Sequence, residues 1–289
     1  MRKISYLFTF FAVLAVCASM ASATVIGNLS IVNTIPGGVV VWASRTDWEP
    51  PANDPHTTPP GTGSFNVSCL TTCMSGDTTD LTYQATPGGP QLSLVPNQLG
   101  TVKDIDITMA PLLSFSPSNP NPGATGVDMF ITIAGTPIDL RLISLGPSAP
   151  TTDCHGIASG QTCSPTITIP AGQPGAGATF VSPFILTYNG IDLRTGKPRT
   201  GVQLAVGGTA RDASTNVSAW TGEFTTQVSM TPGDIQDAIN GDKSIFSSYS
   251  GTFTANFTPV PEPQTTALVL GGLLVLLGRF GMRRYSRGR

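Results

Sequence analysis

Four cysteines carry the clearest chemical signal in the body of the chain: Cys69, Cys73, Cys154 and Cys163. An even number of cysteines is typical of disulfides where the compartment is oxidising. Four thiols allow three pairings. We favour the one that joins Cys69 to Cys73 and Cys154 to Cys163, because both pairs lie in loops rich in Gly, Ser and Thr. The sequence therefore predicts two short loops, each closed by a disulfide.

The same residues offer two other kinds of chemistry. By residue type, Cys69, Cys73, Cys154 and His155 make a zinc ligand set. His155 beside a reduced Cys154 or Cys163 would make a nucleophile pair. However, adjacent side chains such as Cys154 and His155 point apart in an extended chain, and an oxidising compartment favours bridged thiols. We therefore expect no metal and no cofactor.

Carboxylates are the other groups with catalytic potential. A glycosidase needs two of them, and Glu49 or Glu223 can each be combined with an aspartate. Asp104 and Asp106 share one face of an expected strand and are candidates for binding Ca²⁺, but no calcium-loop motif surrounds them. No serine stands in a G-x-S-x-G elbow. We predict that the protein is not an enzyme, with a carbohydrate-active enzyme as the alternative.

Two tryptophans and a basic loop suggest contact with glycans. Trp48 lies in a polar loop bounded by prolines, and Trp220 follows another polar loop. Exposed aromatic rings suit the apolar faces of sugars, while the cluster of Arg194, Lys197 and Arg199 suits an acidic polysaccharide. The alternative is that both tryptophans close the ends of the core and that the basic loop is only solvated.

β-Strands must position these residues through most of the chain. Eight segments are rich in β-branched residues and are separated by turn signals that contain Gly, Pro or Asn. They cover residues 25–32, 39–42, 102–107, 127–134, 180–188, 202–212, 219–230 and 247–257. Many short strands joined in this way predict an all-β fold, and we expect a β-sandwich.

One short helix is expected among these strands. Thr231 suits the N-cap and Pro232 the first helical position. Asp234 favours the positive end of the helix dipole, and Gly241 offers a left-handed stop.

Composition and charge limit the class of protein. Hydrophobic residues at 40% exclude a fully disordered chain, and charged residues at only 11% exclude long coiled coils. Residues 24–263 hold eight basic residues and all 17 acidic ones, a formal charge of −9 that repels nucleic acid. We expect residues 24–258 to form a single domain, with a boundary within the Gly/Pro/Ser-rich residues 146–177 as the alternative.

The N-terminal residues 1–23 have the form of a secretory signal peptide. Two basic residues precede an apolar run over residues 4–16, which is shorter than the ~20 residues that span a bilayer. Small side chains at Ala21 and Ala23 place cleavage by signal peptidase before Thr24. The chain is therefore expected to be exported.

The C-terminal residues predict a second sorting segment. Residues 259–264 form a proline-rich linker, because proline blocks helix continuation and favours an extended backbone before it. The apolar residues 265–282 predict a transmembrane helix of marginal length, and the basic tail 283–289 belongs on the cytoplasmic side.

The linker contains the motif Val260, Pro261, Glu262 and Pro263. Followed by a short Leu/Gly-rich helix and an arginine cluster, it resembles the PEP-CTERM sorting signal of Gram-negative bacteria. The resemblance implies cleavage near the motif by an exosortase, a membrane transpeptidase-like protease. It also implies a final place on the cell surface or in an exopolysaccharide matrix. The body is diffusely similar to uncharacterised PEP-CTERM proteins, and this likeness brings no activity with it. The alternative is a permanent tail anchor.

Together, these features predict an exported protein with a structural or adhesive role. The expected partners are signal peptidase, an exosortase-type protease, exopolysaccharide, and the inner membrane as a temporary anchor. A carbohydrate-active enzyme or a polysaccharide-binding module on the same fold is the alternative.

Overall fold

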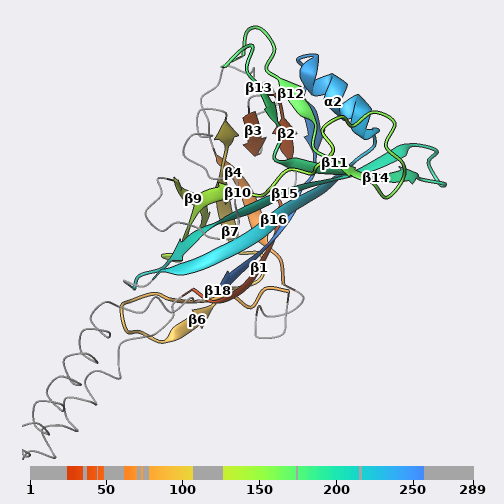
Figure 1. Cartoon of the computed structure of the whole chain (residues 1–289). Helices are drawn as coiled ribbons and strands as arrows, with labels where there is room; N and C mark the ends of the chain where they lie inside the picture. Colours follow the sequence, from red (N-terminus) through yellow and green to blue (C-terminus); the bar gives the residue numbers. More distant parts are fainter. Residues whose placement is uncertain are drawn as a thin grey trace, which may run out of the picture. The chain divides into compact units, whose positions relative to one another are not determined.

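In a computed structural model of the chain, a ten-stranded antiparallel sheet forms the centre of the fold (Figure 1). The strand order is β10-β9-β7-β4-β1-β18-β16-β15-β14-β11, and β10 also pairs with β15. This additional pairing closes eight of the strands into an antiparallel barrel and leaves β14 and β11 as an extension. The barrel strands are β1 (Gly27–Asn33), β4 (Thr62–Val67), β7 (Leu99–Lys103), β9 (Val127–Ile133), β10 (Asp139–Leu145), β15 (Pro198–Arg211), β16 (Ser218–Val228) and β18 (Ser250–Asn256).

The structure describes residues 25–34, 38–43, 45–48, 62–69, 73, 78–106, 126–173, 175–214 and 217–256. All of them belong to one compact unit, Met1–Phe257. The predicted signal peptide, linker, transmembrane segment and basic tail lie outside the described residues. Within the described ranges, no helix has the length and apolar character needed to cross a bilayer.

The expected all-β class with one short helix is confirmed, but the two-sheet sandwich is replaced by a barrel. The difference arises from β10 (Asp139–Leu145), a strand outside the eight segments that the sequence predicts. One edge of β10 pairs with β9, and the other edge pairs with residues 206–211 of β15. Because β14 pairs with residues 198–204 of the same strand, β15 changes its partner halfway along its length.

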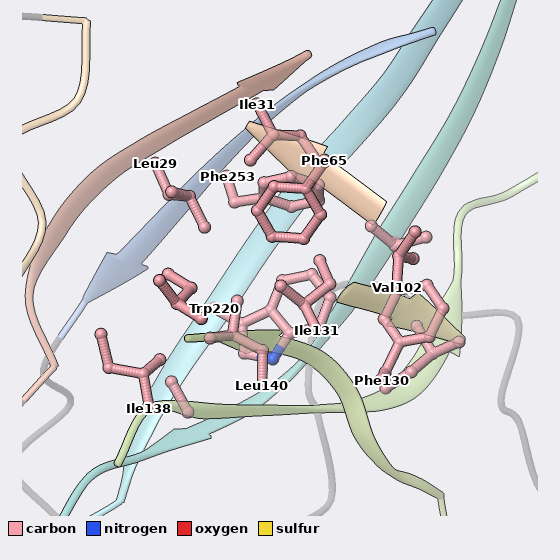
Figure 2. Packing of buried hydrophobic residues seen from close by; sticks show 14 of the residues in the cluster. Leu29, Ile31, Phe65, Val102, Phe130, Ile131, Ile138, Leu140, Trp220 and Phe253 are labelled. Atoms are coloured by element: carbon pink, nitrogen blue, oxygen red, sulfur yellow. The ribbon is translucent and has the colours of Figure 1, made fainter. Parts of the chain in front are cut away.

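Aromatic rings fill the barrel interior (Figure 2). Phe65, Phe130, Trp220, Phe224 and Phe253 are all buried. The centroid of the Trp220 ring lies 6.5 Å from that of Phe130 in a stacked arrangement and 5.8 Å from that of Phe253 in an edge arrangement. Side chains that alternate inward along each strand therefore meet in one dense core.

Strand glycines make room for these rings. Phe65 pairs with Gly100 on β7, and a Cβ atom at Gly100 would lie 2.2 Å from the Phe65 ring. Phe253 pairs with Gly222 on β16, where a Cβ atom would lie 2.3 Å from the Phe253 ring. Each ring packs over the glycine of the neighbouring strand, in space that a side chain at the glycine position would otherwise fill.

A second, smaller core lies beyond the barrel, where α2 packs against the extension of the sheet (Figure 1). Its buried members are Ala43, Cys154, Cys163, Ile167, Leu186, Ile235 and Ile239. The extension is formed by β14 (Phe184–Ile191) and β11 (Thr162–Cys163). The remaining strands are β2 (Val39–Val41), β3 (Arg45–Trp48), β5 (Thr82–Gln84), β6 (Gln91–Ser93), β8 (Ile105–Asp106), β12 (Thr166–Thr168), β13 (Thr179–Val181) and β17 (Ile245–Ser247).

The helix α2 (Pro232–Asn240) begins as the sequence predicts. The Thr231 hydroxyl accepts a hydrogen bond from the Asp234 backbone N–H, and the Asp234 carboxylate accepts one from the Thr231 backbone N–H. Ile235 and Ile239 face the smaller core. The end of the helix differs from the prediction, because Gly241 has a φ of −88° and is not left-handed.

Candidate functional site

The basic loop of the sequence forms the tip of the hairpin between β14 and β15. The Asp192 carboxylate accepts hydrogen bonds from the backbone N–H groups of Arg194, at 2.8 Å, and Thr195, at 3.3 Å. The Asp192 backbone N–H donates to the carbonyl oxygen of Lys197, which closes the turn. Gly196 has a φ of +67°, a conformation that L side chains rarely adopt. This turn leaves the side chains of Arg194 and Lys197 exposed.

Arg194, Lys197 and Arg199, called here the basic hairpin, line a groove of about 660 Å³. Arg199 Nη2 donates a hydrogen bond of 2.7 Å to Gln227 Oε1. Among the described residues, none of the three cations forms an ion pair with a carboxylate. The structure thus brings the three predicted basic residues together, with their charges directed to solvent.

A second groove, of about 510 Å³, lies next to the first, and Gln227 lines both. We call it the hydroxyl groove, because Thr, Ser and Gln side chains dominate its walls. Thr225 and Ser250 are joined by a hydrogen bond of 3.1 Å between their hydroxyl oxygens. Gln203 donates a hydrogen bond from Nε2 to the Glu223 carboxylate. The lining residues are Thr187, Gly201, Val202, Gln203, Thr225, Thr226, Gln227, Ser248, Tyr249 and Ser250.

The two tryptophans do not belong to this surface, so the prediction that they contact a glycan is wrong. Trp48 is 2% exposed and Trp220 is 1% exposed. Trp48 packs with its ring centroid 4.3 Å from that of Phe224. Trp220 Nε1 donates to the backbone oxygens of Arg141 and Thr209, both at 3.1 Å. Both rings are core residues, as the alternative interpretation holds.

The candidate carboxylates are dispersed in the structure. Glu223 lies opposite Ala205 and Thr252 on the neighbouring strands, and among the described residues no second carboxylate pairs with it. Asp104 is 2% exposed and accepts a hydrogen bond of 2.9 Å from the Trp48 backbone N–H, which makes it part of the core rather than of a wet strand face. Glu49 lies outside the described residues.

The structure contains the two disulfides Cys69–Cys73 and Cys154–Cys163, which is the pairing favoured from the sequence. All three cysteines of the candidate zinc set are therefore in disulfides, Cys69 and Cys73 with each other and Cys154 with Cys163. Within the part of the chain that the structure describes, no three His, Cys, Asp or Glu side chains gather as a metal site.

His155 links the loop of the Cys154–Cys163 disulfide to α2. Its Nδ1 lies 2.6 Å from Asp153 Oδ1, and its Nε2 lies 3.2 Å from Asp237 Oδ1 on the helix. The hydrogen bonds to Asp153 and, second, to Asp237 raise the pKa of His155 above its ordinary value. The hydrogen bond from His155 in turn lowers the pKa of Asp153. The protonated imidazole therefore holds two carboxylates from different segments.

We expect this contact to weaken as the pH rises. Because the folded-state pKa of His155 is raised, its contribution to stability is complete below pH 6.5, the ordinary pKa of histidine, and is lost as the pH rises through the folded-state value. Thermal unfolding at a series of pH values between 6 and 9 should show a falling melting temperature in the wild type. The same series should be flatter in His155→Gln. The variant Lys243→Gln, an exposed position after the same helix and without this contact, serves as the control, and a slope in His155→Gln equal to that of the wild type would contradict the assignment.

The groove residues escaped the sequence analysis because they come from four strands. Thr187, Gln203, Thr225 and Ser250 lie on β14, β15, β16 and β18, respectively. The available signal was the alternation of polar residues along each strand, which places hydroxyl and amide groups on one face. Comparison with protein-family models, with curated proteins and with solved structures gives no match to this chain.

Proposed function

We propose that this chain is an exported protein with a structural or adhesive role at the cell surface or in an extracellular matrix. The observation that supports this proposal most directly is the pair of disulfides, Cys69–Cys73 and Cys154–Cys163, which is consistent with an extracellular, exported protein. A closed barrel with an aromatic core is a suitable scaffold for such a role, because its strands leave few unpaired edges.

The proposed route begins with signal peptidase, which removes residues 1–23. The apolar segment 265–282 then holds the chain in the inner membrane as a temporary anchor. An exosortase-type protease cleaves near the motif formed by Val260, Pro261, Glu262 and Pro263. The support for this route is the order of the sequence features: a basic and apolar leader at one end, and a proline motif, apolar segment and arginine cluster at the other.

Mass spectrometry of the surface form tests this route. In a host that contains an exosortase, the mature chain should begin at Thr24 and end between Pro261 and Gln264. Replacing Pro261, Glu262 and Pro263 together by alanine should leave the C-terminus intact, whereas a triple alanine replacement at the exposed residues Pro87, Pro90 and Lys243 should still give the processed C-terminus. Recovery of Arg289 in the wild-type surface form would instead indicate a permanent anchor.

The role that we propose is not enzymatic. Glycoside hydrolysis needs two carboxylates on either side of the scissile bond, and Glu223 is hydrogen-bonded to an amide, Gln203. The basic hairpin favours a second candidate, a polysaccharide-binding module. Turnover of a polysaccharide that is abolished in Glu223→Gln would overturn the non-enzymatic proposal.

A further inference from the structure

We propose that the basic hairpin and the hydroxyl groove form one continuous binding site for an acidic polysaccharide. The carboxylates of the polymer lie at Arg194, Lys197 and Arg199, and its hydroxyl groups lie along the strands. This inference rests on the proposed matrix role and names the chemistry of the ligand.

The charge distribution supports an anionic ligand at the hairpin. Residues 24–263 carry a formal charge of −9, yet three of their eight basic residues lie within six positions of one another. Within the described residues these three cations have no carboxylate partner, and Asp192 uses its carboxylate to hold the turn. Exposed charges that the protein leaves unpaired are available to a ligand of opposite sign.

Arg199 is also held in position. Its Nη2 donates to Gln227 Oε1 at 2.7 Å, which uses one of the five N–H donors of the guanidinium group. The remaining donors can bind a carboxylate, and a planar guanidinium suits the two oxygens of that group. The same bond engages the amide oxygen of Gln227, and among the described residues its amide NH₂ group has no acceptor, which leaves it to donate to a ligand.

The hydroxyl groove supplies the polar partners that a sugar chain needs. The bond from Gln203 Nε2 to Glu223 leaves Gln203 Oε1 as an acceptor, while Thr225 and Ser250 present a pair of hydroxyl groups. Both grooves, at about 660 and 510 Å³, are open and polar, which suits an extended sugar polymer better than an enclosed small molecule. Since Gln227 lines both, a chain anchored at the hairpin can continue along the strands.

An anionic lipid surface is the rival ligand for the cations. Leu193 at the tip of the hairpin is 99% exposed, and an apolar residue beside cations suits a membrane interface. A lipid headgroup bound at the tip, however, would not contact the hydroxyl and amide groups of the hydroxyl groove, which leads away from the tip. The two grooves together therefore favour the polysaccharide.

Binding of the full chain, purified in a mild nonionic detergent, to immobilised polygalacturonate and alginate tests the proposal. Fully methyl-esterified polygalacturonate is the matched polymer, because it keeps the sugar backbone and loses the charge. We expect binding to the two acidic polymers, weaker binding to the ester, and a loss of affinity at higher ionic strength. The triple variant Arg194→Gln, Lys197→Gln, Arg199→Gln should bind roughly tenfold more weakly.

Single variants locate the site. Lys197→Gln should weaken binding, whereas Lys243→Gln, which removes an equal charge after α2, should not. Thr225→Val should weaken binding about threefold, since it removes one hydrogen-bonding hydroxyl. Thr132→Val is its control, because Thr132 on β9 forms the same kind of hydroxyl pair with Thr101 on β7, at 2.8 Å, and neither strand lines the grooves.

Three results would overturn the inference: no binding to either acidic polymer, equal binding to the methyl ester, or equal losses in Lys197→Gln and Lys243→Gln. Binding to nanodiscs of phosphatidylglycerol is measured in parallel. If the triple variant loses binding to these nanodiscs but not to the acidic polymers, the cations serve a lipid surface instead. A correctly processed surface form that binds neither polymer would remove this inference and leave the matrix role standing. An intact C-terminus with normal binding would remove the proposed matrix role and leave the polysaccharide site standing.

Discussion

Replacing Trp220 by alanine is expected to destabilise the protein by about 3–5 kcal/mol, because it empties the centre of the barrel. The ring is 1% exposed and lies against Phe130 and Phe253 (Figure 2). Its Nε1 also satisfies the backbone oxygens of Arg141 and Thr209. The loss should appear as a shift of the denaturant midpoint, followed by far-ultraviolet circular dichroism.

The variant Trp220→Phe separates the two contributions. It keeps an aromatic ring in the core and removes both indole hydrogen bonds, so its loss should be clearly smaller than that of Trp220→Ala. If Trp220 were a glycan-stacking residue on the surface, both variants would unfold within about 0.5 kcal/mol of the wild type. That result would contradict the barrel interior described here.

Replacing Gly208 by alanine is the second change with a large expected effect, a loss of about 3 kcal/mol. Gly208 lies on β15 opposite Leu142 of β10 and Trp220 of β16. A Cβ atom there would lie 1.8 Å from the Arg141 carbonyl oxygen. Because the obstructing atom is backbone, the strands must separate at the pairing that closes the barrel.

Gly201→Ala is the matched control on the same strand. A Cβ atom at Gly201 would lie closest to the side-chain amide of Asn189, at 3.3 Å, which can move aside, and at an ordinary contact distance of 3.9 Å from Thr187. We expect this variant to lie within about 0.5 kcal/mol of the wild type in the same denaturation experiment. Equal losses in Gly208→Ala and Gly201→Ala would show that β10 and β15 do not close the sheet.

Local patterns were sufficient for part of the fold. The segments 202–212, 219–230 and 247–257 match β15, β16 and β18 closely, because β-branched residues alternate with polar ones along them. The start of α2 was predictable because its capping residues are adjacent in sequence.

Closure of the barrel was not predictable from local patterns. It depends on pairing between residues 139–145 and residues 206–211, which are far apart along the chain. The strand β10 alternates polar and apolar residues over Asp139–Leu142, but its irregular register with both neighbours cannot be read from that pattern. Long-range pairing therefore decided between a sandwich and a barrel.

The candidate site, like the fold, was only partly predictable from the sequence. The basic hairpin was visible in the sequence because its three cations are close together along the chain. Trp48 and Trp220 were misplaced because their polar neighbours suggested exposure, whereas their burial follows from strand pairing. Glycines opposite the rings, such as Gly208 opposite Trp220, become informative only when the register is known.

The short strand β11 (Thr162–Cys163) is the last strand of the extension, and its length limits how copies of the chain can pair with one another. An open sheet normally ends in a row of unpaired amide and carbonyl groups that can recruit another molecule. Here that free margin is only two residues long, and Cys163 within it is bridged to Cys154. This margin of the ten-stranded sheet therefore offers little backbone with which a second copy of the chain could pair, even where copies are concentrated in a dense layer.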